Sequence, residues 1–119
     1  MPHKGICART ADALDYAVLS LRYYYDSGNV YLVRNPLVIL AVLYDRLGHF
    51  EPAAITCGFA LTPFTQAALP EISATVTHLR DALGNDAYES LSRAGEHMTA
   101  AEMVAYAYGQ IDRLRAELG

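Results

Sequence analysis

Hydrophobic residues recur along this chain at steps of three and four, the spacing that places them on one face of an α-helix. The pattern is clearest in residues 40–60, LAVLYDRLGHFEPAAITCGFA, where one apolar helical stretch stops at Gly48 and an alanine-rich one follows after a short turn. This arrangement is typical of two antiparallel helices joined by a turn. No segment has a convincing strand pattern, so we predict an all-α fold.

Six helices are predicted from this periodicity and from residues that start or stop helices. We expect them at about residues 10–26, 30–47, 51–61, 69–83, 86–94 and 99–118, arranged as three antiparallel pairs. Residues 1–9 are expected to form a flexible N-terminal arm, and residues 10–119 a single helical domain.

Glycines mark most of the predicted helix ends. Four of them follow apolar stretches and are expected to be helix C-caps: Gly28, Gly48, Gly84 and Gly95. The clearest start signal is the pair Thr99 and Glu102, which has the spacing of a capping box. Thr62 and Pro63 are expected to close the third helix.

Pro36 complicates the second predicted helix, because a proline inside a helix removes a hydrogen bond and clashes with the preceding turn. Two outcomes are open. The helix begins at Pro36 with Asn35 as its N-cap, or a short first segment from Val30 bends at Pro36. From Pro36 to Tyr44 the chain is apolar on nearly all sides, which predicts a centrally buried helix.

The composition favours burial or a partner over nucleic acid. Apolar residues make up 53% and charged residues 18% of the 119 residues, whereas a typical domain has about 25% charged residues. The net charge is −4 and the nine Lys and Arg are scattered, so we predict no direct contact with nucleic acid. Arg22, Arg34 and Arg46 either form solvated ion pairs or edge a contact surface.

No motif in the chain carries catalytic or metal chemistry. Cys7 and Cys57 are far apart and have no ligand spacing, and the four histidines include no pair four residues apart. No nucleophile elbow or phosphate loop is present. We therefore predict no enzyme activity, no cofactor and no metal. The N-terminus lacks an apolar signal region and the longest apolar run is too short for a bilayer, so we expect a cytoplasmic protein.

Nine tyrosines and no tryptophan form the most distinctive feature of the composition. Tyr23, Tyr24 and Tyr25 point in three directions around one helix, and Tyr31 follows closely. Either this helix packs on two sides, or these tyrosines form a contact surface for another helix, because tyrosine is favoured at interfaces. We predict Tyr23, Tyr24, Tyr25 and Tyr31 as partner-binding residues.

A ligand pocket is the alternative. The helices that contain residues 36–83 would enclose an apolar cavity near Cys57, Phe59 and Phe64, with Tyr44 as its polar group. This hypothesis makes the chain a ligand-sensing domain.

The stretch 40–60 resembles a single tetratricopeptide-type unit. The residues that carry this resemblance are Tyr44, Gly48, Phe50, Ala53 and Ala60. The chain from about Ala13 onward resembles the C-terminal helical region of large actinobacterial regulators that combine an NTPase module with a LuxR-type DNA-binding or nucleotide-cyclase domain. That resemblance rests on the order of Ser27-Gly28-Asn29, Leu47-Gly48 with Glu51, Ala82-Leu83-Gly84, Gly95 and the segment 98–107.

The resemblance implies a short α-solenoid, in which each helix pair is buried against its neighbours. Only a scaffold role is implied, since the catalytic and DNA-binding modules of those regulators have no counterpart in this sequence. We thus expect a non-catalytic protein–protein interaction module that binds a protein partner or itself as a homodimer.

Overall fold

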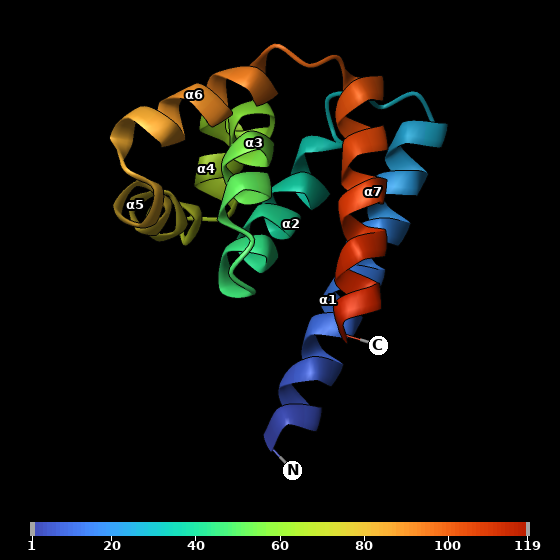
Figure 1. Cartoon of the computed structure of the whole chain (residues 1–119). Coiled ribbons are helices and arrows are strands. Elements are labelled where there is room, and N and C mark those ends of the chain that lie inside the picture. Colours follow the sequence, from blue (N-terminus) through green and yellow to red (C-terminus); the bar gives the residue numbers. More distant parts are fainter. Residues whose placement is uncertain (1, 119) are drawn as a thin grey trace.

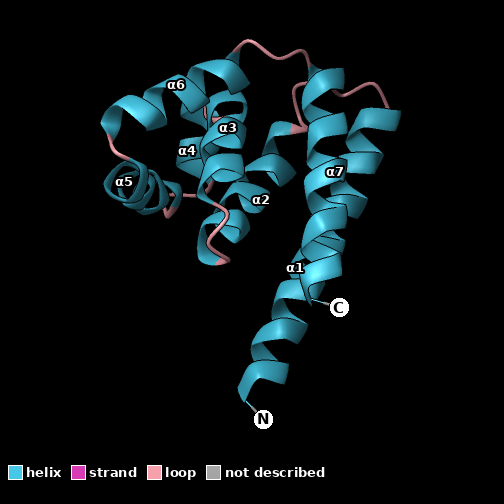
Figure 2. Ribbon diagram, in the orientation of Figure 1, coloured by secondary structure: helices cyan, strands magenta, loops and turns pink. Residues whose placement is uncertain are grey.

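The computed structural model describes the backbone of residues 2–118 and the side chains of residues 11–117. Over this range the chain forms α-helices joined by short turns and no strand (Figures 1 and 2). In chain order the helices are α1 (Pro2–Asp26), α2 (Arg34–Arg46), α3 (Phe50–Ala60), α4 (Pro63–Ala68), α5 (Ile72–Leu83), α6 (Asn85–Glu96) and α7 (Ala100–Leu118). The predicted all-α class is confirmed.

The arrangement centres on α2 and α3. Helix α3 packs against α2 on one side and α6 on the other, and it also contacts α5 and α7. Helix α2 lies between α3 and α1. In Figure 1 the first and last helices, α1 and α7, run side by side in opposite directions, while α4, α5 and α6 gather beyond α3.

The apolar run in α2 is buried, as its sequence predicts. Every residue of this run is buried except Ile39, which is half-buried. Leu37, Leu40 and Tyr44 are fully inaccessible. A helix that is apolar on nearly all sides needs neighbours on all sides, and α1, α3, α4 and α5 provide them.

Helix α1 begins at Pro2 rather than at residue 10. Residues 2–9, which we expected to form an arm, continue α1, and their side chains lie outside the described part of the structure. Pro2 stands at the first helical position, where its missing N–H leaves no hydrogen bond unmade. The helix ends as predicted: Gly28 has a φ of +80°, and the Asn29 N–H donates to the Tyr24 carbonyl at 2.8 Å.

Helix α2 follows neither predicted alternative in full. It begins at Arg34, after Val33, so Asn35 is its second residue rather than its N-cap. Residues 30–33 form turns instead of a helical segment that bends at Pro36. Pro36 lies in the first turn of α2, where the backbone N–H groups have no intrahelical acceptor, so proline breaks no hydrogen bond there.

The turn between α2 and α3 confirms the predicted helix pair. Gly48 has a φ of +84°. Its N–H donates to the Asp45 carbonyl at 3.1 Å, and the His49 N–H donates to the Tyr44 carbonyl at 2.8 Å. These two bonds satisfy the last carbonyls of α2 in the manner of a Schellman motif.

The capping box at the start of α7 is also confirmed. The Thr99 N–H donates to Glu102 Oε1 at 2.8 Å, and the Glu102 N–H donates to Thr99 Oγ1 at 3.1 Å. Each side chain therefore satisfies a backbone donor that the first turn leaves open.

Helix α4 was missed by the sequence analysis, which assigned Thr62 and Pro63 to a helix end. Thr62 instead caps a new helix: the Thr65 N–H donates to Thr62 Oγ1 at 3.1 Å, and the Thr62 N–H donates to Thr65 Oγ1 at 2.8 Å. Pro63 occupies the first helical position. The described residues thus form one helix more than the six predicted. Helix α5 begins at Ile72 rather than at residue 69, after the turn 69–71.

Gly95 does not end a helix, contrary to the prediction. It is buried within α6, and a Cβ placed on it would lie 1.8 Å from the Ile55 carbonyl oxygen of α3. Gly58 of α3 makes the reciprocal approach, since its Cβ would lie 1.8 Å from the Ser92 carbonyl oxygen of α6. The backbones of α3 and α6 are therefore in direct contact at two glycines.

Candidate functional site

Helix α1 carries an apolar stripe that faces solvent. Tyr16, Leu19 and Tyr23 are 63%, 65% and 68% exposed. Their spacing of three and four residues places them on one face of the helix. The opposite face carries the fully buried Leu14 and Leu21. Helix α1 therefore has two apolar faces: one packs against the core, and the other carries the stripe and faces solvent.

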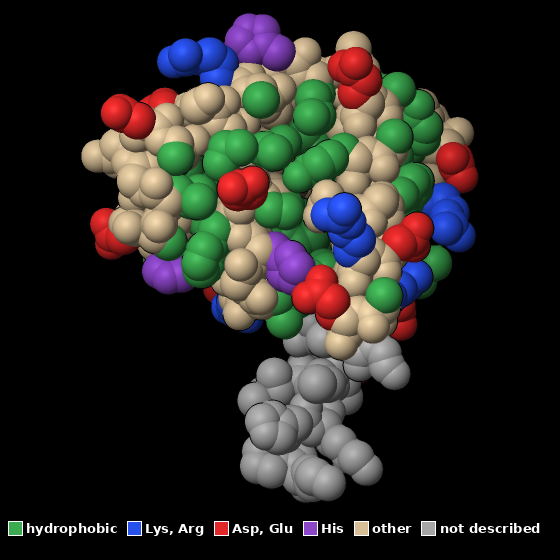
Figure 3. All heavy atoms as spheres, in the orientation of Figure 1, with side chains coloured by type: hydrophobic (Ala, Val, Ile, Leu, Met, Phe, Trp, Pro, Cys, Tyr) green, Lys and Arg blue, Asp and Glu red, His purple; other side chains and the backbone are tan. Residues whose placement is uncertain are grey.

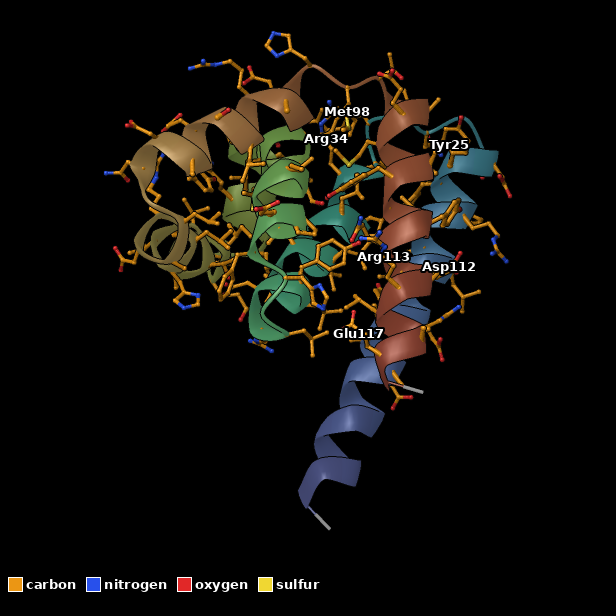
Figure 4. All side chains as sticks on the ribbon, in the orientation of Figure 1. Tyr25, Arg34, Met98, Asp112, Arg113 and Glu117 are labelled. Carbon is orange, nitrogen blue, oxygen red and sulfur yellow. The ribbon has the colours of Figure 1, made fainter. Side chains whose placement is uncertain are left out.

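The four tyrosines that we predicted as partner-binding residues differ in how exposed they are in the structure. Tyr23 is exposed and Tyr31 is 52% exposed. Tyr24 and Tyr25 are half-buried and pack against the core (Figure 4 labels Tyr25). The Tyr24 ring meets the Tyr23 ring edge to face, with centroids 5.6 Å apart.

Sequence reasoning missed Tyr16 and Leu19. The signal was present, because these residues and Tyr23 repeat with helical spacing. It was obscured by the stronger stripe of Leu14, Val18 and Leu21 on the other face.

The structure does not bring the four predicted pocket residues together. Tyr44 and Cys57 are fully buried, Phe59 is 7% exposed, and Phe64 is 56% exposed on α4. Of these four residues, Cys57 and Phe59 line a common cavity. The Tyr44 hydroxyl is buried without a hydrogen-bond partner among the described residues. Burial, and to a lesser degree the neighbouring Tyr106, raises the pKa of Tyr44 above its usual value.

The cavity that contains Cys57 and Phe59 has a volume of about 380 Å³. It lies where the start of α2, the end of α3 and the last turns of α6 come together. The residues that line it are Arg34, Cys57, Gly58, Phe59, Leu61, Thr62, Ser92 and Glu96. The volume falls at the lower end of the range of about 300–1,000 Å³ for small-molecule sites.

Three contacts hold the side chain of Arg34 in this cavity, which we call the Arg34 cavity. Its Nε donates to the Phe59 carbonyl at 3.2 Å. Its guanidinium carbon lies 4.4 Å from the centre of the Phe59 ring and 5.3 Å from that of Tyr31. Among the described side chains no carboxylate lies within 4 Å of Arg34, whereas Arg46 pairs with Glu71 at 3.4 Å. Of the two roles left open for Arg34, the solvated ion pair is therefore not formed among the described side chains.

A second cavity of about 380 Å³ adjoins the first, because Leu61 and Ser92 line both. It contains another arginine, Arg80, which lies 4.5 Å from the centre of the Tyr88 ring. Arg80 differs from Arg34 in having a carboxylate partner, Glu89, at 2.6 Å. Burial raises the pKa of Tyr88 to about 12.

A third hollow, of about 350 Å³, lies between the start of α3 and the middle of α7. Hydrophobic side chains gather on this face of the molecule, between α7 and the α3–α6 side (Figure 3). Tyr106, Arg113 and His49 line the hollow, and His49 Nε2 lies 3.2 Å from Glu117 Oε1. Figure 4 labels Arg113 and Glu117 on α7. Burial and the nearby Glu51 raise the pKa of Tyr106.

No group of three or more His, Cys, Asp or Glu side chains is placed to hold a metal ion within the described part of the chain. None of the described helices is long and apolar enough to cross a membrane.

Comparison with models of protein families, with curated proteins and with solved structures finds no match to this chain.

Proposed function

We propose that this chain is a non-catalytic protein–protein interaction module that associates with a second copy of itself through the exposed stripe of α1. The observation that carries the proposal is the row of Tyr16, Leu19 and Tyr23, each more than 60% exposed on one helix face. Tyrosine is enriched at protein interfaces because it buries a large ring and keeps a polar group at the rim.

The energetics favour covering this stripe. Full burial of a large apolar side chain contributes about 1.5–3 kcal/mol relative to exposure. Val30 and Tyr31 are also about half exposed, in the turn that follows α1. Charged and exposed residues flank the stripe: Asp12, Arg22 and Asp26. An apolar centre with a charged rim is the usual anatomy of an interface.

A second copy is the simplest partner. A two-fold axis places the same stripe on both sides of the interface, so no other surface has to be complementary to it. The closed pair leaves no stripe uncovered, whereas a head-to-tail contact would.

The helix arrangement supports a scaffold role of the tetratricopeptide type. Helices α2 and α3 form a pair around the Gly48 turn. The alanines that would allow close helix approach, Ala53, Ala54 and Ala60, are fully buried. We propose on this basis that the chain is related to the C-terminal scaffold region of large actinobacterial regulators.

The test is the solution mass of the protein by light scattering, at micromolar and at tenfold higher concentration. The wild type is expected to be a dimer and Leu19→Asp a monomer, because a carboxylate at the centre of the stripe would be buried without a partner. Phe64→Asp is the matched control, because Phe64 is similarly exposed but lies on α4. A monomeric wild type, or a Leu19→Asp variant that stays dimeric, would overturn the proposal.

A second candidate function, small-molecule sensing, is favoured by the Arg34 cavity. The cavity retains two residues of the predicted pocket, Cys57 and Phe59, but not Tyr44 or Phe64. A thermal-shift screen with small molecules tests this candidate, since a ligand that binds only the folded state raises Tm.

A further inference from the structure

The Arg34 cavity holds two opposite charges that do not meet. Arg34 and Glu96 both line it. They lie more than 4 Å apart, since they form no salt bridge in the structure, although the pairs Arg46–Glu71 and Arg115–Asp15 do. Arg34 is the first residue of α2, and Glu96 is the last residue of α6. The fold therefore brings two residues that are far apart in the sequence to the same cavity.

Three contacts position the Arg34 side chain. The Phe59 carbonyl accepts the hydrogen bond from Nε, and two aromatic rings lie against the guanidinium. Only Nε is used in this contact, so the terminal nitrogens keep their donors for another acceptor. A guanidinium fixed in this way loses little conformational entropy when it binds a carboxylate.

We propose that the Arg34 cavity binds a small zwitterionic ligand of the free amino-acid class. The ligand carboxylate binds Arg34, and its ammonium group binds Glu96. The apolar residues Phe59 and Leu61 border the space between them. This proposal does not rest on the proposed self-association, because Tyr16, Leu19 and Tyr23 of the α1 stripe do not line this cavity.

The pair of charges selects against simpler ligands. A plain carboxylate or phosphate would be attracted by Arg34 but repelled by Glu96. An amine would be attracted by Glu96 but repelled by Arg34. A ligand that carries both charges satisfies both residues at once. The cavity volume of about 380 Å³ also favours a ligand no larger than a single amino acid or a close derivative.

The first experiment is a thermal-shift and calorimetric titration of the full chain with each standard L-amino acid. Propionate and ethylamine serve as half-ligands that carry only one of the two charges. We expect at least one amino acid to raise Tm in a saturable manner, while the half-ligands bind at least about tenfold more weakly, because each lacks a charge-assisted hydrogen bond. The proposal is overturned if no amino acid binds, or if propionate binds as well as the amino acid does.

Two variants locate the site. Arg34→Gln and Glu96→Gln are each expected to weaken binding of that amino acid by about tenfold or more. Arg93→Gln and Asp81→Asn are matched controls, because they remove one positive and one negative exposed charge outside the cavity. These controls are expected to bind as the wild type does.

The variants also separate binding from folding. Arg34→Lys keeps the charge but not the fork of donors, and the exposed Glu96 can be changed without touching the core. Circular dichroism checks that each variant is folded. Unchanged affinity in folded Glu96→Gln would exclude a role for the ammonium contact and overturn the zwitterion assignment. The solution mass of Arg34→Gln and of Glu96→Gln is expected to equal that of the wild type, which distinguishes this site from the α1 stripe.

Discussion

The α3–α6 and α1–α7 contacts join helices in different ways. Between α3 and α6 the backbones touch at Gly58 and Gly95, where no side chain fits. Between α1 and α7 the contact includes an ion pair at its solvent edge, Arg115–Asp15, at 2.6 Å. The glycine of α7, Gly109, has open space around its missing Cβ. One contact is thus fixed by backbone geometry, and the other is bordered by exposed side chains.

This difference implies different tolerance to change. A backbone carbonyl cannot rotate away from an added methyl group, so α3 and α6 must move apart to accept one. Arg115 and Asp15 are each about half exposed and can exchange their partner for water. We therefore expect stability to be sensitive at the first contact and nearly indifferent at the second.

The largest effect is expected for Gly58→Ala and Gly95→Ala. Each should lower the free energy of unfolding by about 3 kcal/mol, because the new methyl group would overlap a carbonyl of the partner helix. Gly109→Ala is the matched control, and it should raise stability by about 0.5–1 kcal/mol because alanine is the better helix former. Urea unfolding followed by circular dichroism measures all three. Equal stability of Gly95→Ala and wild type would show that the contact is not close.

The second-largest effect is a loss of stability at alkaline pH, which arises from titratable groups on the same two helices, α3 and α6. Burial in the folded state raises the pKa of Cys57 from 9.0 to about 12. Well below pH 9 the thiol is protonated in both states and the shift has no effect. From pH 9 to 12 the unfolded chain releases this proton and the folded chain keeps it, so stability falls by up to about 1.4 kcal/mol per pH unit.

Urea unfolding at pH 8, 9 and 10 measures this loss. Tyr88 of α6 has its pKa raised in the same direction and adds to the loss above pH 10. Replacing Cys57 by Ala, which cannot titrate, should flatten the pH dependence between pH 9 and 10, although the smaller side chain lowers stability at every pH. A slope that persists in Cys57→Ala would assign the effect to other groups.

A smaller effect is expected at the start of α7. Thr99→Ala removes the acceptor of the Glu102 N–H and should lower the free energy of unfolding by about 1 kcal/mol. Thr99→Ser keeps the hydroxyl and should retain most of the stability. Chemical unfolding of the two variants beside wild type checks this, and equal loss in both would mean that the hydroxyl is not what matters.

The smallest effect is expected at the edge of the α1–α7 contact. Asp15→Asn breaks the pair with Arg115 and should change stability by at most about 0.5 kcal/mol at low salt. High salt should remove even this difference, because it screens exposed charges. A double-mutant cycle with Arg115→Gln measures the coupling. A coupling energy above about 1 kcal/mol would contradict the prediction that stability is nearly indifferent to changes at the edge of the α1–α7 contact.

Local signals in the sequence predicted most of the helices. The Gly48 turn, the Thr99 capping box and the apolar run of α2 act through residues within a few positions of one another, and the structure confirms all three. Helix α4 was not predicted, although its signal is equally local. Thr62 and Pro63 also fit the end of the preceding helix, and the capping box of α4 is completed by Thr65 instead of the usual Glu or Gln.

Features that depend on distant residues were not predictable in this way. Gly95 follows an apolar stretch as a C-cap would, and only the approach of Ile55 from another helix explains it. Arg34 meets Phe59, 25 positions away, through a backbone carbonyl, which leaves no mark on residue type. The exposed side of α1 was predictable in part: Tyr23 and Tyr31 are exposed, while Tyr24 and Tyr25 turned inward.

The packing of the first helix against the last also bears on the order of folding. Asp15 and Arg115 are separated by 100 positions in the chain, so their contact closes a long loop and gains little until the rest of the chain is ordered. Helices α2 and α3 are joined by a short turn and can pair early. We therefore expect changes that destabilise the buried face of α7, such as Ile111→Ala, to accelerate unfolding and leave the folding rate nearly unchanged, a φ-value near zero. Changes in the Gly48 turn are expected to slow folding itself.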